Sequence, residues 1–335
     1  MEDREFDQFV RERANAPTRR SLVQGLAAVL GAAGFGIGLG LDAEADKSKK
    51  KKRKQKQKRK QKKKEKNQEC NDNGKVCATP TNPCLAVSCE SNTCVTSNVA
   101  DGTACGGGQT CTNGTCSCPD GKTCDVQVGP GSMNDWFGYN DETDEKDDSL
   151  LEFVTGPGNP PYGSGSVQMT VTGQQRRNIA TYQFAGVKLA DISQLKFTTY
   201  NASATNNQGP NASGYLHFNV DFNGTDTWQR RLVFVPQSNG SVKQDKWQEW
   251  DAIDNGDALW VLSGGLWPDD NLPSDTEKTW DAILAQYPQV RIRVTDAFLG
   301  IRVGEPYPDG FTGNVGSVTF GSGNASTRFV FGPTS

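Results

Sequence analysis

The sequence predicts an all-β fold, an antiparallel β-sandwich with one short helix, preceded by a small disulfide-rich module and a disordered N-terminal region. From about Val126 onward, apolar and polar residues alternate in short runs between turn residues, with the period of half-buried strands. All ten cysteines lie between Cys70 and Cys124, and Lys47–Lys66 is almost entirely charged, so neither region can build an apolar core. The expected boundaries are 1–45 for an export signal, 46–69 for a tether, 70–125 for the cysteine module and 126–335 for the sandwich.

The first 45 residues have the organisation of an export signal. Arg19 and Arg20 precede an apolar run over Leu22–Leu41, and Ala43-Glu44-Ala45 follows as a small-x-small cleavage site. The paired arginine is typical of the Tat route, so we expect the protein outside the cell or at its surface. The apolar run is also long enough to span a bilayer, and an uncleaved anchor is therefore the alternative.

The tether that follows is strongly basic. Lys47–Lys66 holds thirteen lysines and two arginines against one acid, Glu65, and such a segment is expected to be extended and disordered. It can adhere to a polyanion such as an anionic cell-wall polymer, or act as a solvated spacer. Its place after an export signal argues against a specific nucleic-acid partner, and membrane contact is expected only through the leader or the tether. Residues 67–335 carry 16 basic and 30 acidic residues, a net charge of −14.

The cysteine module predicts disulfides and not a metal centre. An even number of cysteines in an exported chain indicates a disulfide framework, whereas zinc sites use close pairs separated by two residues, a spacing that is absent here. The spacing leaves the connectivity open. The predicted disulfide residues are Cys70, Cys77, Cys84, Cys89, Cys94, Cys105, Cys111, Cys116, Cys118 and Cys124.

The strand pattern of the C-terminal region predicts hairpins and one helix. Apolar residues alternate over 216–222, and Asn223-Gly224 after this run is a hairpin signal. Val318 and Phe320 are expected to pair with Phe329 and Phe331 in a closing hairpin. A capping box of Ser274 and Glu277 predicts the start of a helix that Pro288 ends. The expected apolar face of this helix consists of Trp280, Ile283, Leu284 and Tyr287.

The C-terminal region resembles a group of secreted, mostly uncharacterised bacterial β-sandwich domains. The resemblance covers roughly Val126 to Pro333 and implies a jelly-roll shape like that of carbohydrate-binding modules, with no catalytic residue to carry over. The leader and the lysine-rich tether are similar to the export regions of other bacterial surface proteins. The residues that carry the domain resemblance are Asn140–Asp144, Phe153–Gly158, Leu189–Ile192, Trp247–Ala252 and Gly304–Gly310.

No residue is assigned a catalytic role. A nucleophilic triad needs a general base, and the one histidine, His217, occupies a polar position of a strand, where we expect a surface or edge side chain. Two carboxylates can hydrolyse a glycosidic bond, but an acidic surface brings carboxylates together by chance. We therefore expect a noncatalytic protein and keep a glycan-active hydrolase as a remote alternative.

The densest acidic cluster suggests a structural calcium ion as the one possible cofactor. Calcium takes about six to eight oxygen ligands from such loops. A solvated acidic loop is the alternative, and we prefer it. The candidate ligands are Asp141, Glu142, Asp144 and Glu145.

Tryptophan is concentrated in the C-terminal region, which favours polysaccharide as the partner. Aromatic rings offer large apolar contact faces that can stack on sugars. Rings in turn-rich segments are the better candidates for exposed contacts, although core packing is the alternative for each. These candidates are Trp136, Tyr139, Trp260, Trp267 and Tyr307. The leading hypothesis is glycan binding by the sandwich, and a structural or adhesive surface protein without a specific small ligand is the second.

Overall fold

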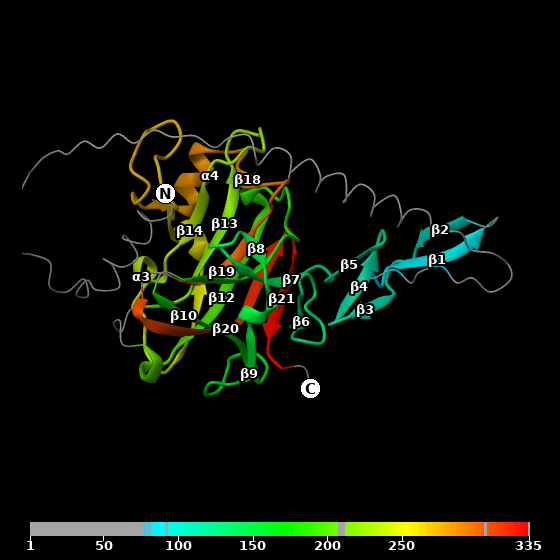
Figure 1. Cartoon of the computed structure of the whole chain (residues 1–335). Helices are drawn as coiled ribbons and strands as arrows, with labels where there is room; N and C mark the ends of the chain where they lie inside the picture. Colours follow the sequence, from blue (N-terminus) through cyan, green and yellow to red (C-terminus); the bar gives the residue numbers. More distant parts are fainter. Residues whose placement is uncertain are drawn as a thin grey trace, which may run out of the picture. The chain divides into compact units, whose positions relative to one another are not determined.

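Figure 1 shows the computed structural model of the chain. It describes residues 77, 80, 82–90, 93–173, 175–206, 212–304 and 307–333, with only the backbone at 307–309. The predicted export signal and basic tether, and with them Arg19, Arg20, Ala43 and Ala45, lie outside the described residues. None of the helices in the described part has the length and apolarity needed to cross a membrane.

The described residues fall into two compact units. The larger contains residues 106–109 and 118–333, and the smaller contains the preceding described residues together with 110–117. The larger unit thus takes in part of the region that the sequence assigned to the cysteine module, including the Cys118–Cys124 disulfide.

The smaller unit consists of short strands joined by disulfides. Strands β1 and β2 pair antiparallel, as do β4 and β5, and β4 lies between β3 and β5. The predicted disulfides are confirmed, because the described cysteines are all disulfide-bonded; Cys70 lies outside the described residues. The disulfides between described cysteines are Cys77–Cys94, Cys84–Cys111, Cys105–Cys116 and, in the larger unit, Cys118–Cys124, and Cys89 is disulfide-bonded as well. The strands are β1 (Leu85–Glu90), β2 (Thr93–Asn98), β3 (Ala104–Gly106), β4 (Gln109–Thr112) and β5 (Thr115–Ser117).

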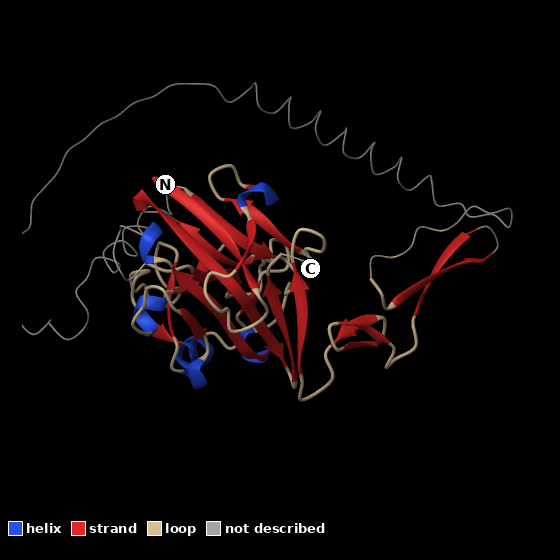
Figure 2. Cartoon of the chain, turned by 90° about the horizontal axis from the view of Figure 1, so that it is seen from below, coloured by secondary structure: helices blue, strands red, loops and turns tan. Residues whose placement is uncertain are grey.

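The larger unit confirms the predicted β-sandwich. Figure 2 shows that strands make up most of it and that its helices are short. A seven-stranded sheet has the order β15-β12-β20-β10-β9, with β21 beside β20 and β6 beside β21. Pairing is antiparallel except between β6 and β21. Its strands are β6 (Thr123–Val128), β9 (Glu152–Thr155), β10 (Gly165–Gly173), β12 (Ile192–Asn201), β15 (Trp247–Asp251), β20 (Tyr307–Ser322) and β21 (Ala325–Phe331).

The second sheet has nine strands in the order β17-β16-β14-β13-β19-β11-β7-β8, with β18 beside β13. Its strands are β7 (Trp136–Asn140), β8 (Glu145–Lys146), β11 (Arg176–Thr181), β13 (Tyr215–Asp221), β14 (Arg231–Phe234), β16 (Leu259–Leu262), β17 (Lys278–Thr279), β18 (Arg291–Ile292) and β19 (Leu299–Gly304). The helices are α3 (Pro236–Asn239) and α4 (Trp280–Gln286), with 3-10 turns at Asp148–Leu150, Leu189–Asp191, Ser203–Thr205 and Asp254–Gly256.

The core lies between the two sheets and follows from the alternation in the sequence. Leu216, Phe218 and Val220 of β13 belong to the same buried cluster as Met169 of β10 and Phe197 of β12. Successive side chains of a strand point to opposite faces, so the odd-numbered residues of β13 face away from this core.

The two predicted hairpins are present. Strands β13 and β14 pair with Leu216 opposite Phe234, and the Asn223-Gly224 signal lies in their connection. Strands β20 and β21 form the predicted closing hairpin, in a register that places Val318 opposite Phe329 and Phe320 opposite Thr327.

The predicted start of the helix is wrong, whereas its end is correct. Helix α4 begins at Trp280, and the hydroxyl of Thr279 caps it by accepting a hydrogen bond from the Ala282 N–H at 3.1 Å. Ser274 lies before this start, and its backbone is bonded to Leu262 of β16 and to Gly265 of the preceding loop. The helix ends two residues before Pro288.

Candidate ligand-binding hollow

The aromatic residues singled out from the sequence are not exposed. Trp136, Tyr139, Trp260 and Trp267 are all buried, so the expectation that these four rings form exposed contacts is wrong. Trp136 packs edge-on against Phe331, at 5.1 Å between ring centroids. The fifth candidate, Tyr307, has a side chain outside the described residues.

Trp260 and Trp267 are buried for different reasons. Trp260 lies in β16, and its indole N–H donates to the Ala252 carbonyl at 2.9 Å inside the sandwich core. Trp267 does belong to a loop, but the loop folds inward, so that the indole N–H donates to Thr276 O and the ring stacks on Tyr287. Trp267 thereby joins the main buried cluster of the sandwich.

The four acidic calcium candidates point to different partners. Asp141 pairs with Arg231 and Arg302, and Glu142 pairs with Arg177 and accepts the Arg176 N–H. Asp144 accepts the hydroxyl of Tyr139, and Glu145 is exposed in β8. In the described part of the chain these carboxylates do not form a group whose ligand atoms lie within 4.8 Å of one another. The calcium ion therefore stays a prediction, without a preformed carboxylate cage to support it.

Asp141 is the centre of a buried polar network on the outer face of the nine-stranded sheet. Besides its two arginines, its carboxylate lies 3.4 Å from the amide nitrogen of Asn178. The Asn178 amide oxygen lies 2.9 Å from Nε2 of His217, so one chain of contacts joins four strands and the β7–β8 turn. Buried charge demands such pairing, because an unpaired ion in the interior is strongly destabilising.

His217 is a member of this network and not the surface or edge residue that the sequence suggested. It lies in the middle of β13 and is 1% exposed. Burial, together with the nearby guanidinium of Arg231, lowers the pKa of His217 well below its ordinary value, so the ring is neutral at pH 7. The contacts described for this imidazole are with the Asn178 amide and the rings of Tyr215 and Phe298. None of these is a serine or cysteine nucleophile.

A hollow of about 390 Å³ lies where two connections of the nine-stranded sheet meet. One is the β13–β14 connection, and the other is the loop from Ser263 to Glu277 between β16 and β17. Trp228 lines this hollow, and 45% of its surface is exposed. Among the exposed large hydrophobic residues that the structure describes, it is the one aromatic residue. The residues lining the hollow are Phe222, Asn223, Trp228, Gln229, Arg230, Leu266, Pro268, Asp269 and Tyr287.

The floor of the hollow consists of buried aromatic rings. Phe222 and Tyr287 are buried and lie 4.7 Å apart between ring centroids. Beneath them, Trp267 contacts both rings, and the ammonium group of Lys278 lies 4.8 Å from the centre of its ring. The floor therefore belongs to the packed core, whereas Trp228 and Leu266 are exposed apolar walls.

The side chain of Gln229 holds the β13–β14 connection in shape. Its amide nitrogen donates to Asp221 at 2.9 Å and to Asn223 at 2.6 Å, and its amide oxygen accepts the Phe222 N–H at 2.8 Å. Asp221 is fully buried and also pairs with Arg291. Burial by itself raises the pKa of Asp221, but the hydrogen bonds from Arg291 and Gln229 outweigh it and lower that pKa, so the anchor stays ionised.

Arg230 is the cationic group of the hollow, and Asp269 is the anionic one. Both have backbone conformations that side chains other than glycine rarely adopt, with φ of 107° at Arg230 and 70° at Asp269. The guanidinium of Arg230 also lies against Gly265, where a Cβ atom would approach its nitrogens to 2.9 Å. Gly265 thus permits the position of Arg230, and strained residues of this kind gather at functional sites.

The lining supplies donors and acceptors for a polar ligand but not the carboxylate pair of a hydrolase. Asn223 and Gln229 offer amide groups, Arg230 offers guanidinium donors, and Trp228 offers an apolar face. Among the described residues that line this hollow, Asp269 is the one carboxylate. Glycoside hydrolysis uses two, so this arrangement favours binding over that reaction.

Trp228 is the residue that the sequence interpretation missed. It stands alone between polar residues, with Asp226 and Thr227 before it and Gln229 and Arg230 after it. Trp260, by contrast, lies between Leu259 and Val261. A tryptophan surrounded by polar residues between two strands is therefore the sequence signal that could have predicted the exposure of Trp228.

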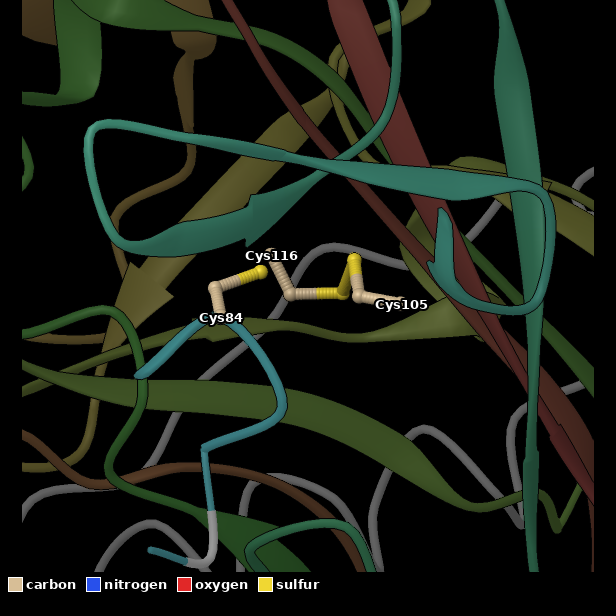
Figure 3. Close-up of side chains that lie close together, drawn as sticks. All are labelled: Cys84, Cys105 and Cys116. Carbon is tan, nitrogen blue, oxygen red and sulfur yellow. A yellow bond between two sulfur atoms is a disulfide. The ribbon is translucent and has the colours of Figure 1, made fainter. Parts of the chain in front are cut away.

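A cluster of three sulfur atoms in the smaller unit is not a metal centre. Figure 3 shows Cys84, Cys105 and Cys116 close together, and their sulfur atoms lie within 4.8 Å of one another. Cys105 is bonded to Cys116, and Cys84 is bonded to Cys111. Metal binding requires thiolates, and these sulfurs are already used in disulfides.

No model of a known protein family matches the chain, and no curated protein matches it in sequence. Among solved structures, the chain is similar to one described as the structure of TmCBM61 in complex with beta-1,4-galactotriose. The match has 10% sequence identity and a TM-score of 0.24, and it covers 56% of this chain and 89% of that chain. A similarity of this degree carries no argument about the function of this chain.

Proposed function

We propose that the chain is an exported, noncatalytic protein that binds a glycan in the Trp228 hollow of its β-sandwich. The observation that carries the proposal is the exposure of Trp228 beside amide, guanidinium and carboxylate groups in one hollow. Sugar rings have apolar faces and polar edges, so they match a site that combines one aromatic platform with a few placed polar groups.

The disulfides support the exported location. Disulfides persist in oxidising compartments and are rare in the cytosol, and the described cysteines are all bonded. The proposed leader with Arg19 and Arg20 would bring the folded domain there, and the basic tether would hold it near anionic surface polymer. Replacement of both arginines by lysine is expected to retain the protein inside the cell, which fractionation measures.

A glycan array with the full-length protein tests the binding function. We expect a signal on at least one polysaccharide class, lost in Trp228→Ala and kept in Leu272→Ala. Leu272 is a suitable control because it is an exposed apolar residue of the same loop system that does not line the hollow. Equal signals from the two variants, or none from the folded protein, would contradict the proposal.

A further inference from the structure

We infer that the Trp228 hollow recognises the terminal monosaccharide or disaccharide unit of a neutral glycan, and not an internal stretch of a long chain. The inference rests on the proposed glycan-binding function and specifies its ligand. Four properties of the hollow carry it: its size, its single aromatic platform, its braced walls and its balanced charge.

The size of the hollow limits the length of chain that it can hold. Its volume of about 390 Å³ lies near the lower end of the range for small-ligand sites, about 300–1,000 Å³. A site of this size accommodates a short saccharide unit, whereas a long chain would have to run out over the surrounding surface.

The surrounding surface offers no row of aromatic platforms. Binding along a chain needs successive rings on which successive sugars stack. In the part of the chain that the structure describes, Trp228 is the one aromatic residue among the exposed large hydrophobic side chains. The others of that kind are Val95, Leu266, Leu272 and Val294.

The walls belong to two braced loops, the β13–β14 connection and the loop from Ser263 to Glu277. The β13–β14 connection is braced by Gln229, as described above. The opposite loop is folded back on itself, with the Trp267 N–H bonded to the Leu272 carbonyl at 2.8 Å and Leu266 in a bridge with Pro273. Braced walls of this kind keep their shape when a ligand binds, so the hollow does not widen to admit a longer stretch of chain, which favours recognition of a short end unit.

The charges of the hollow favour a neutral ligand. The lining holds one cationic side chain, Arg230, and one anionic side chain, Asp269, so its formal charge is zero and favours neither a carboxylated nor an amino sugar. The residues after the tether carry a net charge of −14, which repels an anionic polysaccharide. Neutral hexose and pentose units are the class that remains.

Titration calorimetry of the full-length protein with oligosaccharides of increasing length tests the inference. The probes are galacto-, gluco-, manno- and xylo-oligosaccharides from the monosaccharide to the hexasaccharide, with oligogalacturonides of equal length as the anionic arm. For the series that binds, we expect the affinity to reach its final value at the disaccharide and to stay within about twofold up to the hexasaccharide. A gain of about tenfold or more between these two lengths, about 1.4 kcal/mol, would overturn chain-end recognition.

The remaining outcomes separate this inference from the function beneath it. Tighter binding of oligogalacturonides than of every neutral series overturns the neutral-ligand inference while glycan binding stands. Absence of binding by all series overturns this inference, whereas the glycan array decides the proposed function separately. In the binding series, Trp228→Ala should weaken the disaccharide by about tenfold or more, and Leu272→Ala by less than about twofold. If the two variants weaken it equally, the hollow is not the site.

Discussion

The hydroxyl of Tyr287 donates a hydrogen bond to the carbonyl oxygen of Pro268, 2.5 Å away. Tyr287 follows the last residue of α4, and Pro268 belongs to the loop that forms one wall of the hollow. The ring of Tyr287 is also part of the floor, so one side chain fixes both the floor and the wall. Burial raises the pKa of the Tyr287 phenol, which keeps it a donor throughout the neutral and mildly alkaline range.

Replacing this tyrosine by phenylalanine should loosen the wall while keeping the floor. Tyr287→Phe removes the donor and leaves the Pro268 carbonyl without it, a change expected to destabilise the fold by about 1 kcal/mol. Glycan binding should weaken as well, because the wall that carries Leu266 and Asp269 is no longer held. Urea unfolding and calorimetry measure the two effects, and an unchanged affinity would show that the wall needs no tyrosine hydroxyl.

Gly265→Ala tests the position of Arg230. The new methyl group would lie 2.9 Å from the guanidinium nitrogens, and the φ of 74° also strains any other residue there. Gly323→Ala is the matched control, since Gly323 has a φ of 65° but nothing within 4 Å of a Cβ. Both variants should lose about 1 kcal/mol of stability from backbone strain. Only Gly265→Ala should weaken glycan binding, and equal affinities of the two variants would argue against a role for Arg230.

The strands of the fold could be predicted because alternation of apolar and polar residues directly indicates which side chains of a strand are buried. The alternation over 216–222 predicts β13, and that around Val318 and Phe329 predicts the last hairpin, although not the register that places Phe320 opposite Thr327. The start of α4 escaped prediction for a physical reason: Ser274 is used by long-range backbone bonds that no local pattern reveals.

For the site, the sequence predicts the types of group, aromatic and polar side chains of the sandwich, but not which residues supply them. Trp267 is in a loop, as the sequence indicates, but its burial depends on Tyr287, which α4 brings back from twenty residues further on. Asp141 likewise meets Arg231 and Arg302 only because β14 and β19 belong to the same sheet as β7. Contacts between distant strands decide whether a charge or a ring is exposed, and sequence spacing does not contain them.

The ion pairs of Asp141 should be important for stability. Its side chain is 4% exposed, and Asp141→Asn leaves Arg231 and Arg302 without their shared carboxylate, a loss expected to destabilise the fold by about 3–5 kcal/mol. Glu142→Gln is the control: that side chain is 33% exposed, so loss of its pairs should change stability by less than about 1 kcal/mol. Urea denaturation compares the two, and similar losses would contradict a special role for Asp141.

Chelation should have little effect on the same region. The carboxylates of Asp141, Glu142 and Asp144 already have protein partners, so we expect the melting temperature of the full-length protein to be the same in calcium and in chelator. A bound ion would stabilise the folded state by mass action. A melting temperature that rises with calcium concentration would therefore revive the structural calcium site.

His217 should make stability depend on pH. In the folded protein its imidazole lies among Asn178, Tyr215, Phe298 and Arg231, and burial followed by the Arg231 charge lowers its pKa well below 6.5. The unfolded chain keeps the ordinary pKa, so it takes up a proton first as the pH falls. The unfolded state then binds more protons, and the free energy of unfolding decreases as the pH drops below about 6.5.

The variant His217→Gln separates this effect from other titrations, because glutamine keeps a hydrogen-bonding group for Asn178 but cannot take up a proton. Between about pH 7.5 and pH 5, we expect the wild-type melting temperature to fall more steeply than that of the variant. Asp296, whose pKa burial raises, gives a slope of the opposite sign, but both proteins contain it and the comparison removes it. Asp221 has a lowered pKa and loses its contribution only in more acidic solution, outside this range. Parallel pH profiles for the two proteins would mean that His217 takes up its proton equally easily in both states and is not held neutral by the fold.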